Sequence, residues 1–274
     1  MTDRSDWEGR VGRSWADEWR RTDRSFGVLT DRLVEVATRE AFSLALDIGC
    51  GAGETSLRLA DARREARVLG VDISEDLLSM ARERVGDRAN IEFRFADASK
   101  WTAREQERPD LILSRHGVMF FGQPQSAFAH IRAQAKEGCR LAFSCFRARS
   151  ENEWAMKLAG VVSAEASPPS DPRAPGPFAF GDAEYVEQLL SSAGWRDIGF
   201  EAVDYPMIAG EGVDAIEDAL SYFLRIGPAA GAIAALDGEQ RATAIERLRE
   251  LMAANFDGGR VALPASSWIV TARA

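Results

Sequence analysis

The sequence predicts an α/β fold with a doubly wound, largely parallel sheet, and three observations support this prediction. Short apolar runs alternate with helical patterns over residues 44–146. These runs are almost continuously hydrophobic, as expected for strands that helices cover on both faces. A Gly-rich turn follows the first run and opens a helix, the usual place of a ligand-binding turn in such sheets.

The spacing of the apolar residues along the chain predicts where each helix and strand lies. Apolar residues at helical spacing over 26–37, after a Trp- and Arg-rich segment, predict a helical extension or lid over residues 1–40. The strands expected from short apolar or alternating runs are residues 44–48, 68–72, 91–95, 111–114, 140–146, 196–205 and 261–271. The helices expected from a period near 3.6 are residues 55–62, 75–85, 125–136, 182–193, 213–225 and 229–256.

The regular alternation stops near Phe146, and a proline-rich loop or hinge follows. Residues 167–177 contain five of the ten prolines, which excludes a helix or a central strand there. We therefore expect one domain over residues 41–274, in which insertions at about 147–181 and 206–258 form a helical cap.

Composition narrows the classes of function. The formal net charge is -9, which disfavours a nucleic-acid partner. Three cysteines without C-x-x-C spacing indicate neither a disulfide framework nor a zinc site, so no metal is expected. The first residues are polar and no apolar run has the length of a membrane span, which predicts a cytoplasmic protein without a membrane partner.

The most informative segment is the Gly-rich turn at residues 46–55. Its glycines, Gly49, Gly51 and Gly53, allow the backbone to turn sharply and to approach a ligand closely. Such a turn lies at the carboxyl edge of a doubly wound sheet, where ligands bind. The sequence therefore predicts a ligand site at this edge.

Acidic residues end three successive predicted strands: Asp47, Asp72 and Asp97. A carboxylate at the end of the second strand can accept hydrogen bonds from both ribose hydroxyls of a nucleoside, the role expected of Asp72. Asp97 could accept a hydrogen bond from an exocyclic amine of adenine. Each acid alone could instead cap a helix or lie at a solvated strand end, but three successive strand ends together favour ligand binding.

The spacing of the glycines bears on which nucleoside is bound. A dinucleotide site prefers G-x-G-x-x-G, with the pyrophosphate at the start of the helix. Glu54 occupies the position of the last glycine, and its carboxylate would repel a pyrophosphate. The pattern therefore favours S-adenosylmethionine, which carries no phosphate, over a nicotinamide dinucleotide.

These motifs together resemble those of class I S-adenosylmethionine-dependent methyltransferases. The first four family motifs match residues 46–56, 70–74, 95–98 and 109–115, and residues 137–141 resemble the Pro-Gly-Gly stretch with two substitutions. The resemblance covers about residues 40–146 well and extends to both ends of the chain, as in a bacterial small-molecule branch. It implies a Rossmann-like, seven-stranded sheet with an antiparallel last strand.

The resemblance also implies site residues. Asp47, Gly49 and Gly51 would line the methionine end, Asp72 would hold the ribose, and Asp97 would meet the adenine. The other implied cofactor contacts are Cys50, Ile73, Ala98, Ser114, Arg115 and Trp15. Trp15 is expected either to close over the cofactor or to dock the N-terminal helix on the sheet.

His116, one of two histidines, follows the fourth predicted strand, where the acceptor is expected. Its imidazole is either a general base or a ring that packs against the cofactor or caps a loop. We expect methyl transfer to a small molecule, with O-, N- and C-methylation all open. The alternatives are a non-catalytic cofactor-binding scaffold or regulatory protein and, less favoured, a nicotinamide-dependent oxidoreductase. The sequence leaves the oligomeric state open.

Overall fold

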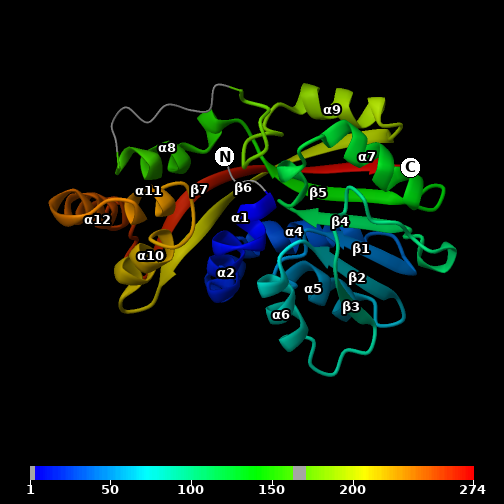
Figure 1. The fold of residues 1–274 in the computed structure, drawn as a ribbon, viewed down its shortest axis with the longest axis horizontal. Helices are drawn as coiled ribbons and strands as arrows, with labels where there is room; N and C mark the ends of the chain where they lie inside the picture. Colours follow the sequence, from blue (N-terminus) through cyan, green and yellow to red (C-terminus); the bar gives the residue numbers. More distant parts are fainter. Residues whose placement is uncertain (1–3, 163–170) are drawn as a thin grey trace.

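The computed structural model describes residues 4–162 and 171–274, and within them a seven-stranded sheet forms the centre of the molecule (Figure 1). The strand order is β3-β2-β1-β4-β5-β7-β6, and β7 runs antiparallel to both of its neighbours. The strands are β1 (Leu44–Ile48), β2 (Arg67–Asp72), β3 (Ile91–Phe95), β4 (Leu111–Arg115), β5 (Arg140–Phe146), β6 (Arg196–Glu211) and β7 (Arg260–Arg273). The predicted Rossmann-like sheet with an antiparallel last strand is confirmed.

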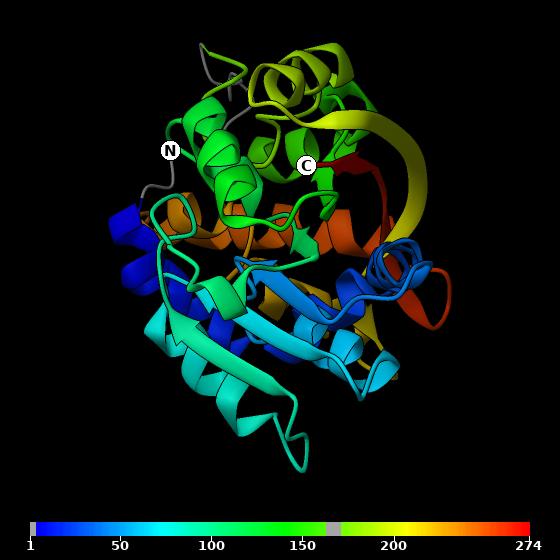
Figure 2. The same cartoon turned by 90° about the vertical axis from the view of Figure 1, so that its right-hand side faces the viewer.

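Helices cover both faces of the sheet, as the continuous apolar strands predict. Figures 1 and 2 place α7 and α9 on one side and α5 and α6 on the other. The α-helices are α1 (Arg4–Glu8), α2 (Arg10–Asp17), α3 (Trp19–Ser25), α4 (Gly27–Thr38), α5 (Glu54–Ala62), α6 (Glu75–Glu83), α7 (Pro124–Gln134), α8 (Glu153–Gly160), α9 (Ala183–Ser192), α10 (Ala215–Phe223), α11 (Ala230–Ala234) and α12 (Gly238–Ala253). None of the helices in the described part of the chain is long and apolar enough to span a bilayer.

Two elements differ from the sequence prediction. Strand β6 does not end at Tyr205 but continues to Glu211, because its residues stay paired with β7 as far as Arg260. Pro206 is tolerated within it since β6 lies at the edge of the sheet, where a missing N–H breaks no essential ladder. The predicted helix over 229–256 is two helices, α11 and α12, and the backbone becomes extended at Asp237 between them.

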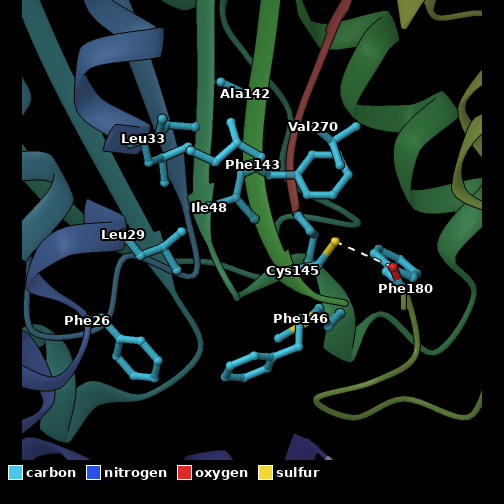
Figure 3. Packing of buried hydrophobic residues seen from close by; sticks show 14 of the residues in the cluster. Phe26, Leu29, Leu33, Ile48, Ala142, Phe143, Cys145, Phe146, Phe180 and Val270 are labelled. Atoms are coloured by element: carbon cyan, nitrogen blue, oxygen red, sulfur yellow. Dashed lines mark hydrogen bonds between the residues drawn. The ribbon is translucent and has the colours of Figure 1, made fainter. Parts of the chain in front are cut away.

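The core lies between the central strands and their helices (Figure 3). Leu29 and Leu33 of α4, four residues apart, share a helix face and are completely buried against the sheet. Phe143 of β5 and Val270 of β7 are equally inaccessible. Because β1, β4 and β5 are buried almost throughout, their carboxyl ends are held firmly where the loops that follow them form a site.

Candidate active site

A cavity of about 1040 Å³ lies at the carboxyl ends of β1, β2, β4 and β5. Its floor is the Gly-rich turn after β1, and helices α2 and α3 contribute to its walls. The segments 146–159, 172–182 and 222–231 supply most of the remaining wall. The volume is at the upper end of the range for single-ligand pockets, so a nucleoside and a second small molecule can share it.

Most of the predicted site residues meet at this cavity, and four do not. Those that line it are Trp15, Gly49, Cys50, Gly51, Asp72, Ile73, Arg115 and His116. Asp47, Asp97, Ala98 and Ser114 are absent from its walls. The cofactor contacts of all these residues stay predictions, and the geometry shows what each side chain does in the protein itself.

The Gly-rich turn is fixed to the neighbouring strand. The amides of Gly49 and Cys50 both donate to the Val71 carbonyl, at 2.9 and 3.1 Å. Gly49 and Gly51 have φ angles of 63° and 55°, which glycine adopts without strain. A Cβ on Gly51 would meet no atom within 4 Å, because this part of the turn faces open space. A ligand can therefore approach the backbone directly.

Asp72 presents a partly satisfied carboxylate to the cavity. Its Oδ2 accepts a hydrogen bond from the Gly51 amide at 2.8 Å, and its Oδ1 accepts one from the Ser74 amide at 2.9 Å. Burial raises the pKa of this carboxyl, and the backbone donors work against that shift. An ionised carboxylate has about four acceptor positions, so two remain for a ligand. This arrangement suits a pair of ribose hydroxyls.

Asp47 lies fully buried behind the turn rather than in the cavity wall. Its Oδ2 accepts hydrogen bonds from the Thr55 and Ser56 hydroxyls at 2.6 and 2.5 Å. Its Oδ1 has no hydrogen-bond partner among the described residues. Burial raises the pKa of Asp47 to about 6, against the two hydroxyl donors. The free oxygen fits an interaction with a cationic amino group at the turn.

Three predicted cofactor contacts make hydrogen bonds or packing contacts within the protein instead: Ser114, Asp97 and Ala98. The Ser114 hydroxyl donates to the Ile48 carbonyl at 2.7 Å and accepts from the Gly117 amide at 3.2 Å, which joins the ends of β1 and β4. The Asp97 carboxylate accepts from the amide and the hydroxyl of Ser99, at 3.0 and 2.6 Å. Ala98 packs in the core. The Asp97 contact caps a turn, whereas the alternatives that the sequence offered were a helix cap and a solvated strand end.

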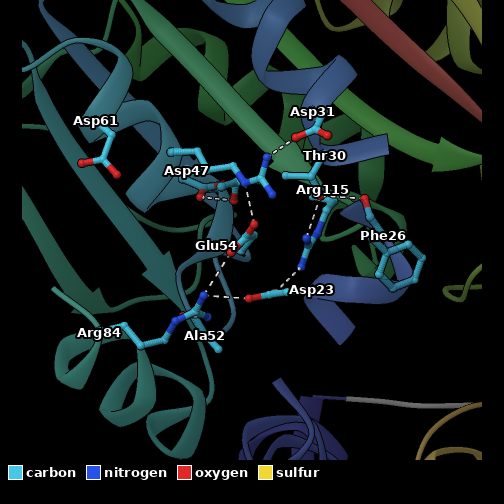
Figure 4. Close-up of polar contacts among 12 residues, drawn as sticks. Asp23, Phe26, Thr30, Asp31, Asp47, Ala52, Glu54, Asp61, Arg84 and Arg115 are labelled. Carbon is cyan, nitrogen blue, oxygen red and sulfur yellow. Dashed lines mark hydrogen bonds and ion pairs between the residues drawn. The ribbon is translucent and has the colours of Figure 1, made fainter. Parts of the chain in front are cut away.

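The N-terminal helices are tied to the site by ion pairs that the sequence motifs did not reveal (Figure 4). Asp23 of α3 lies 2.7 Å from Arg84 and 3.5 Å from Arg115. Arg84 also pairs with Glu54 at 3.0 Å, and Arg115 donates to the Thr30 hydroxyl at 2.8 Å. Burial raises the pKa of Asp23 to about 6, opposed mainly by Arg115. No local pattern pairs residues this far apart in the chain.

His116 occupies an unusual position immediately after β4. Its φ is 61°, and its ring stacks on Phe146 with the centroids 4.3 Å apart. Both ring nitrogens are buried without a hydrogen-bond partner among the described residues. Burial, followed by the charge of Arg115, lowers the pKa of His116 to about 3. The imidazole is therefore neutral throughout the physiological pH range.

Comparison with known proteins now identifies the family. Residues 45–138, which hold the Gly-rich turn and Asp72, match the family model described as a methyltransferase domain. Residues 45–138 therefore form a methyltransferase domain, and the fold of the chain is that of class I S-adenosylmethionine-dependent methyltransferases. The methyltransferase is 26% identical to a trans-aconitate 2-methyltransferase of Paracidovorax citrulli, over 81% of this chain and 85% of that protein.

Two further relatives show how far the similarity reaches. A malonyl-[acyl-carrier protein] O-methyltransferase of Anoxybacillus flavithermus is 34% identical, over 39% of this chain and 40% of that one. The phosphoethanolamine N-methyltransferase 2 of Haemonchus contortus, solved with S-adenosylmethionine, has a TM-score of 0.54 at 16% identity. Its match covers 95% of this chain and 56% of that chain, and it supports the fold.

The residues at the turn fit S-adenosylmethionine, the cofactor that the sequence motifs predict for this methyltransferase domain. Asp72 keeps acceptor positions for the ribose, and the unpartnered oxygen of Asp47 suits the amino group of the methionine end. The sequence suggested that the Glu54 carboxylate would repel a phosphate. In the structure this carboxylate pairs with Arg84 and Arg58, so its charge is not free. When bound, the cofactor supplies a methyl group activated by a sulfonium.

The first prediction concerns Asp72. The Asp72→Ala variant should bind S-adenosylhomocysteine more weakly by about 1.5–3 kcal/mol, the scale of hydrogen bonds to a charged group. Titration calorimetry measures this, and urea unfolding checks that the variant is folded. Asp76→Ala, at an exposed carboxylate on the first turn of α6, is the matched control and should bind like the unaltered protein. Equal affinity in both variants would contradict the ribose assignment.

The second prediction concerns the charge of Asp47. Because its pKa is raised to about 6 in the folded protein, the folded state keeps a proton that the unfolded state releases near pH 4. Its contribution to stability is therefore lost as the pH rises through this window. Asp47→Asn should gain about 1–3 kcal/mol in free energy of unfolding, relative to the unaltered protein, between pH 4.5 and pH 8.

Urea unfolding of the cofactor-free protein at both pH values measures this difference. Asp61→Asn is the control, because its hydrogen bond to Arg88 lowers the pKa of Asp61, so its titration falls below this window. A pH-independent difference for Asp47→Asn would show that the Asp47 carboxyl has an ordinary pKa in the folded protein.

Proposed function

We propose that this methyltransferase transfers the methyl group of S-adenosylmethionine to a small-molecule acceptor held in the cavity. The observation that carries this proposal is the cavity itself, about 1040 Å³ in volume, which extends from the Gly-rich turn to the segments after β5. A polynucleotide acceptor is disfavoured by the net charge of -9, since phosphates need a basic track. Whether oxygen, nitrogen or carbon is methylated stays open.

The relatives support the same acceptor class through their names, which include trans-aconitate and malonyl-[acyl-carrier protein]. We further propose that the enzyme is cytoplasmic. Its three cysteines, Cys50, Cys139 and Cys145, are free and buried, which suits a reducing compartment.

Residues 1–40 are proposed to act as a lid on the methyltransferase domain over 41–274. Trp15 and Trp19 of the N-terminal helices line the cavity, and Trp15 packs 5.8 Å from Trp7. The proposed cap has its first part at 147–181, of which residues 163–170 lie outside the described residues. Its second part begins after β6, at 212 rather than 206, and runs to 258. Together these walls would exclude water from a reaction in which alignment matters most.

His116 is proposed to contact the acceptor, because it lines the cavity and neither of its ring nitrogens has a hydrogen-bond partner in residues 4–162 and 171–274. A neutral imidazole can accept a hydrogen bond from an acceptor hydroxyl or amine and so orient it. The lowered pKa, about 3, makes it a weak general base in the free enzyme. The stack on Phe146 holds the ring in place, which supports a role in positioning the acceptor.

The third prediction tests the proposed function. With labelled S-adenosylmethionine, label should move to compounds of a small-metabolite extract and not to total nucleic acid. Trans-aconitate is the first single compound to assay, given the relative that acts on it. A scaffold would bind the cofactor and release no S-adenosylhomocysteine, and an oxidoreductase would bind NAD more tightly. Label in RNA or DNA, lost steeply with salt, would contradict a small-molecule acceptor.

The fourth prediction concerns His116. Since its ring is neutral above about pH 3, kcat/KM should show no inflection attributable to it between pH 5 and 9. His116→Asn, which tolerates the positive φ, should lower turnover by roughly 5- to 150-fold, equivalent to about 1–3 kcal/mol. Affinity for S-adenosylhomocysteine should stay unchanged. An inflection that disappears in the variant would instead assign a general base, and lost cofactor affinity would assign packing alone.

A further inference from the structure

The guanidinium groups that line the cavity differ in their partners. Arg115 pairs with Asp23 at 3.5 Å, and Arg173 lies 3.9 Å from the carboxylate of Asp182. The guanidinium of Arg225 pairs with Asp17 and Glu18 at 2.5 and 3.2 Å. Each of these three side chains thus has an acidic partner within the protein, whereas Arg10, which also lines the cavity, is exposed to solvent.

Arg149 is different. It lines the cavity and is partly buried, and its guanidinium has neither a hydrogen bond nor an ion pair to any residue that the structure describes. The contact recorded for its guanidinium is with Phe178, whose ring centroid lies 4.3 Å from the guanidinium carbon. Burial alone lowers the pKa of Arg149. A guanidinium carries five N–H donors, and leaving them unanswered in a partly desolvated wall costs free energy.

The contact with Phe178 also defines how such a group can bind. A guanidinium stacked on an aromatic ring is held through its face, so its N–H edge stays available for a planar, bidentate acceptor. A carboxylate has that shape. It also carries the single negative charge that balances one unpaired guanidinium, whereas a phosphate dianion would leave excess charge in the wall.

The strand order places Arg149 on the acceptor side. Asp72 ends β2 and Arg149 follows β5, and β1 and β4 lie between these strands. Three strand spacings correspond to about 14 Å. The turn that fits the methionine end follows β1, and His116 follows β4, so Arg149 lies beyond both. It is therefore placed to meet the acceptor rather than the carboxylate of the cofactor.

The wall around Arg149 is aromatic. Phe146 lies 5.3 Å from Trp154 and 5.7 Å from Phe178, measured between ring centroids, and all three rings line the cavity. Such a wall accepts an apolar molecular body and offers it little hydrogen bonding. The combination of one cation with an aromatic wall defines a ligand with an acidic group on an apolar frame.

We propose that the acceptor of this methyltransferase is a small organic acid, whose carboxylate binds Arg149 while its apolar part packs on Phe146, Trp154 and Phe178. The inference rests on the proposed function, since it names the class of acceptor for that same cavity. Arg149 is then the residue that selects acids over neutral molecules.

The test uses the full-length enzyme, labelled S-adenosylmethionine and a small-metabolite extract separated at pH 8 on an anion exchanger. Label should enter compounds of the retained, anionic fraction and not those of the flow-through. Arg149→Gln should raise the half-saturating amount of the retained fraction by about 10- to 150-fold, the scale of hydrogen bonds to a charged group. Its affinity for S-adenosylhomocysteine and its unfolding in urea should match the unaltered enzyme.

Arg173→Gln is the matched control, because Arg173 also lines the cavity but lies near Asp182; its half-saturating amount should change less than about threefold. Label in the flow-through compounds, or unchanged half-saturation in Arg149→Gln, would overturn the inference and leave the proposed function intact. Lost S-adenosylhomocysteine affinity in Arg149→Gln would overturn it by assigning Arg149 to the cofactor. No label from either fraction or from the whole extract would overturn the proposed function, and the inference with it.

Discussion

The hydrogen bond from the Gly51 amide to the Asp72 carboxylate, 2.8 Å long, is the contact on which the site depends. It joins the turn after β1 to the end of β2 and fixes two things together: the path of the glycine backbone and the direction of the remaining carboxylate lone pairs. The amides of Gly49 and Cys50 reinforce it through the Val71 carbonyl. Because the strands beneath are buried, this edge is preorganised for a nucleoside.

Ion pairs connect the N-terminal helices to this preorganised edge of the sheet. Asp23 lies between Arg84 and Arg115, and Glu54 shares Arg84, so helices α3, α5 and α6 meet at one partly buried network. Removing one member of such a network leaves an uncompensated charge, which costs more than the intact pair contributes. The same network explains why Glu54 is poor evidence against a phosphate ligand. Its carboxylate is paired with arginine side chains, so it would repel a phosphate less than a free carboxylate would.

The sequence predicts well what is local. Strand positions follow from apolar runs, and the turn, Asp72 and Ile73 follow from motifs whose residues are neighbours in the chain. It fails where geometry depends on distant pairing. Strand β6 continues past Tyr205 because β7 lies beside it, and Asp23 meets Arg84 only after both helices pack. Asp97 follows β3 and Ser114 lies near the end of β4, yet the Asp97 carboxylate accepts a hydrogen bond within its own loop and the Ser114 hydroxyl donates to Ile48 of β1. The sequence also gives no sign of Arg149, because what distinguishes it is that its guanidinium has no hydrogen bond or ion pair among the described residues.

A negative charge bound at Arg149 would change the pKa of His116, because both side chains line the same cavity. In the free enzyme, burial and the nearby Arg115 cation together disfavour a proton on His116. An acceptor carboxylate bound at Arg149 would bring negative charge into the same cavity and act in the opposite direction, raising the pKa of the imidazole. The ring would then be a stronger base with acceptor present than without it. An acidic acceptor would therefore supply both its own anchor and part of the environment that strengthens the hydrogen bond His116 accepts from it.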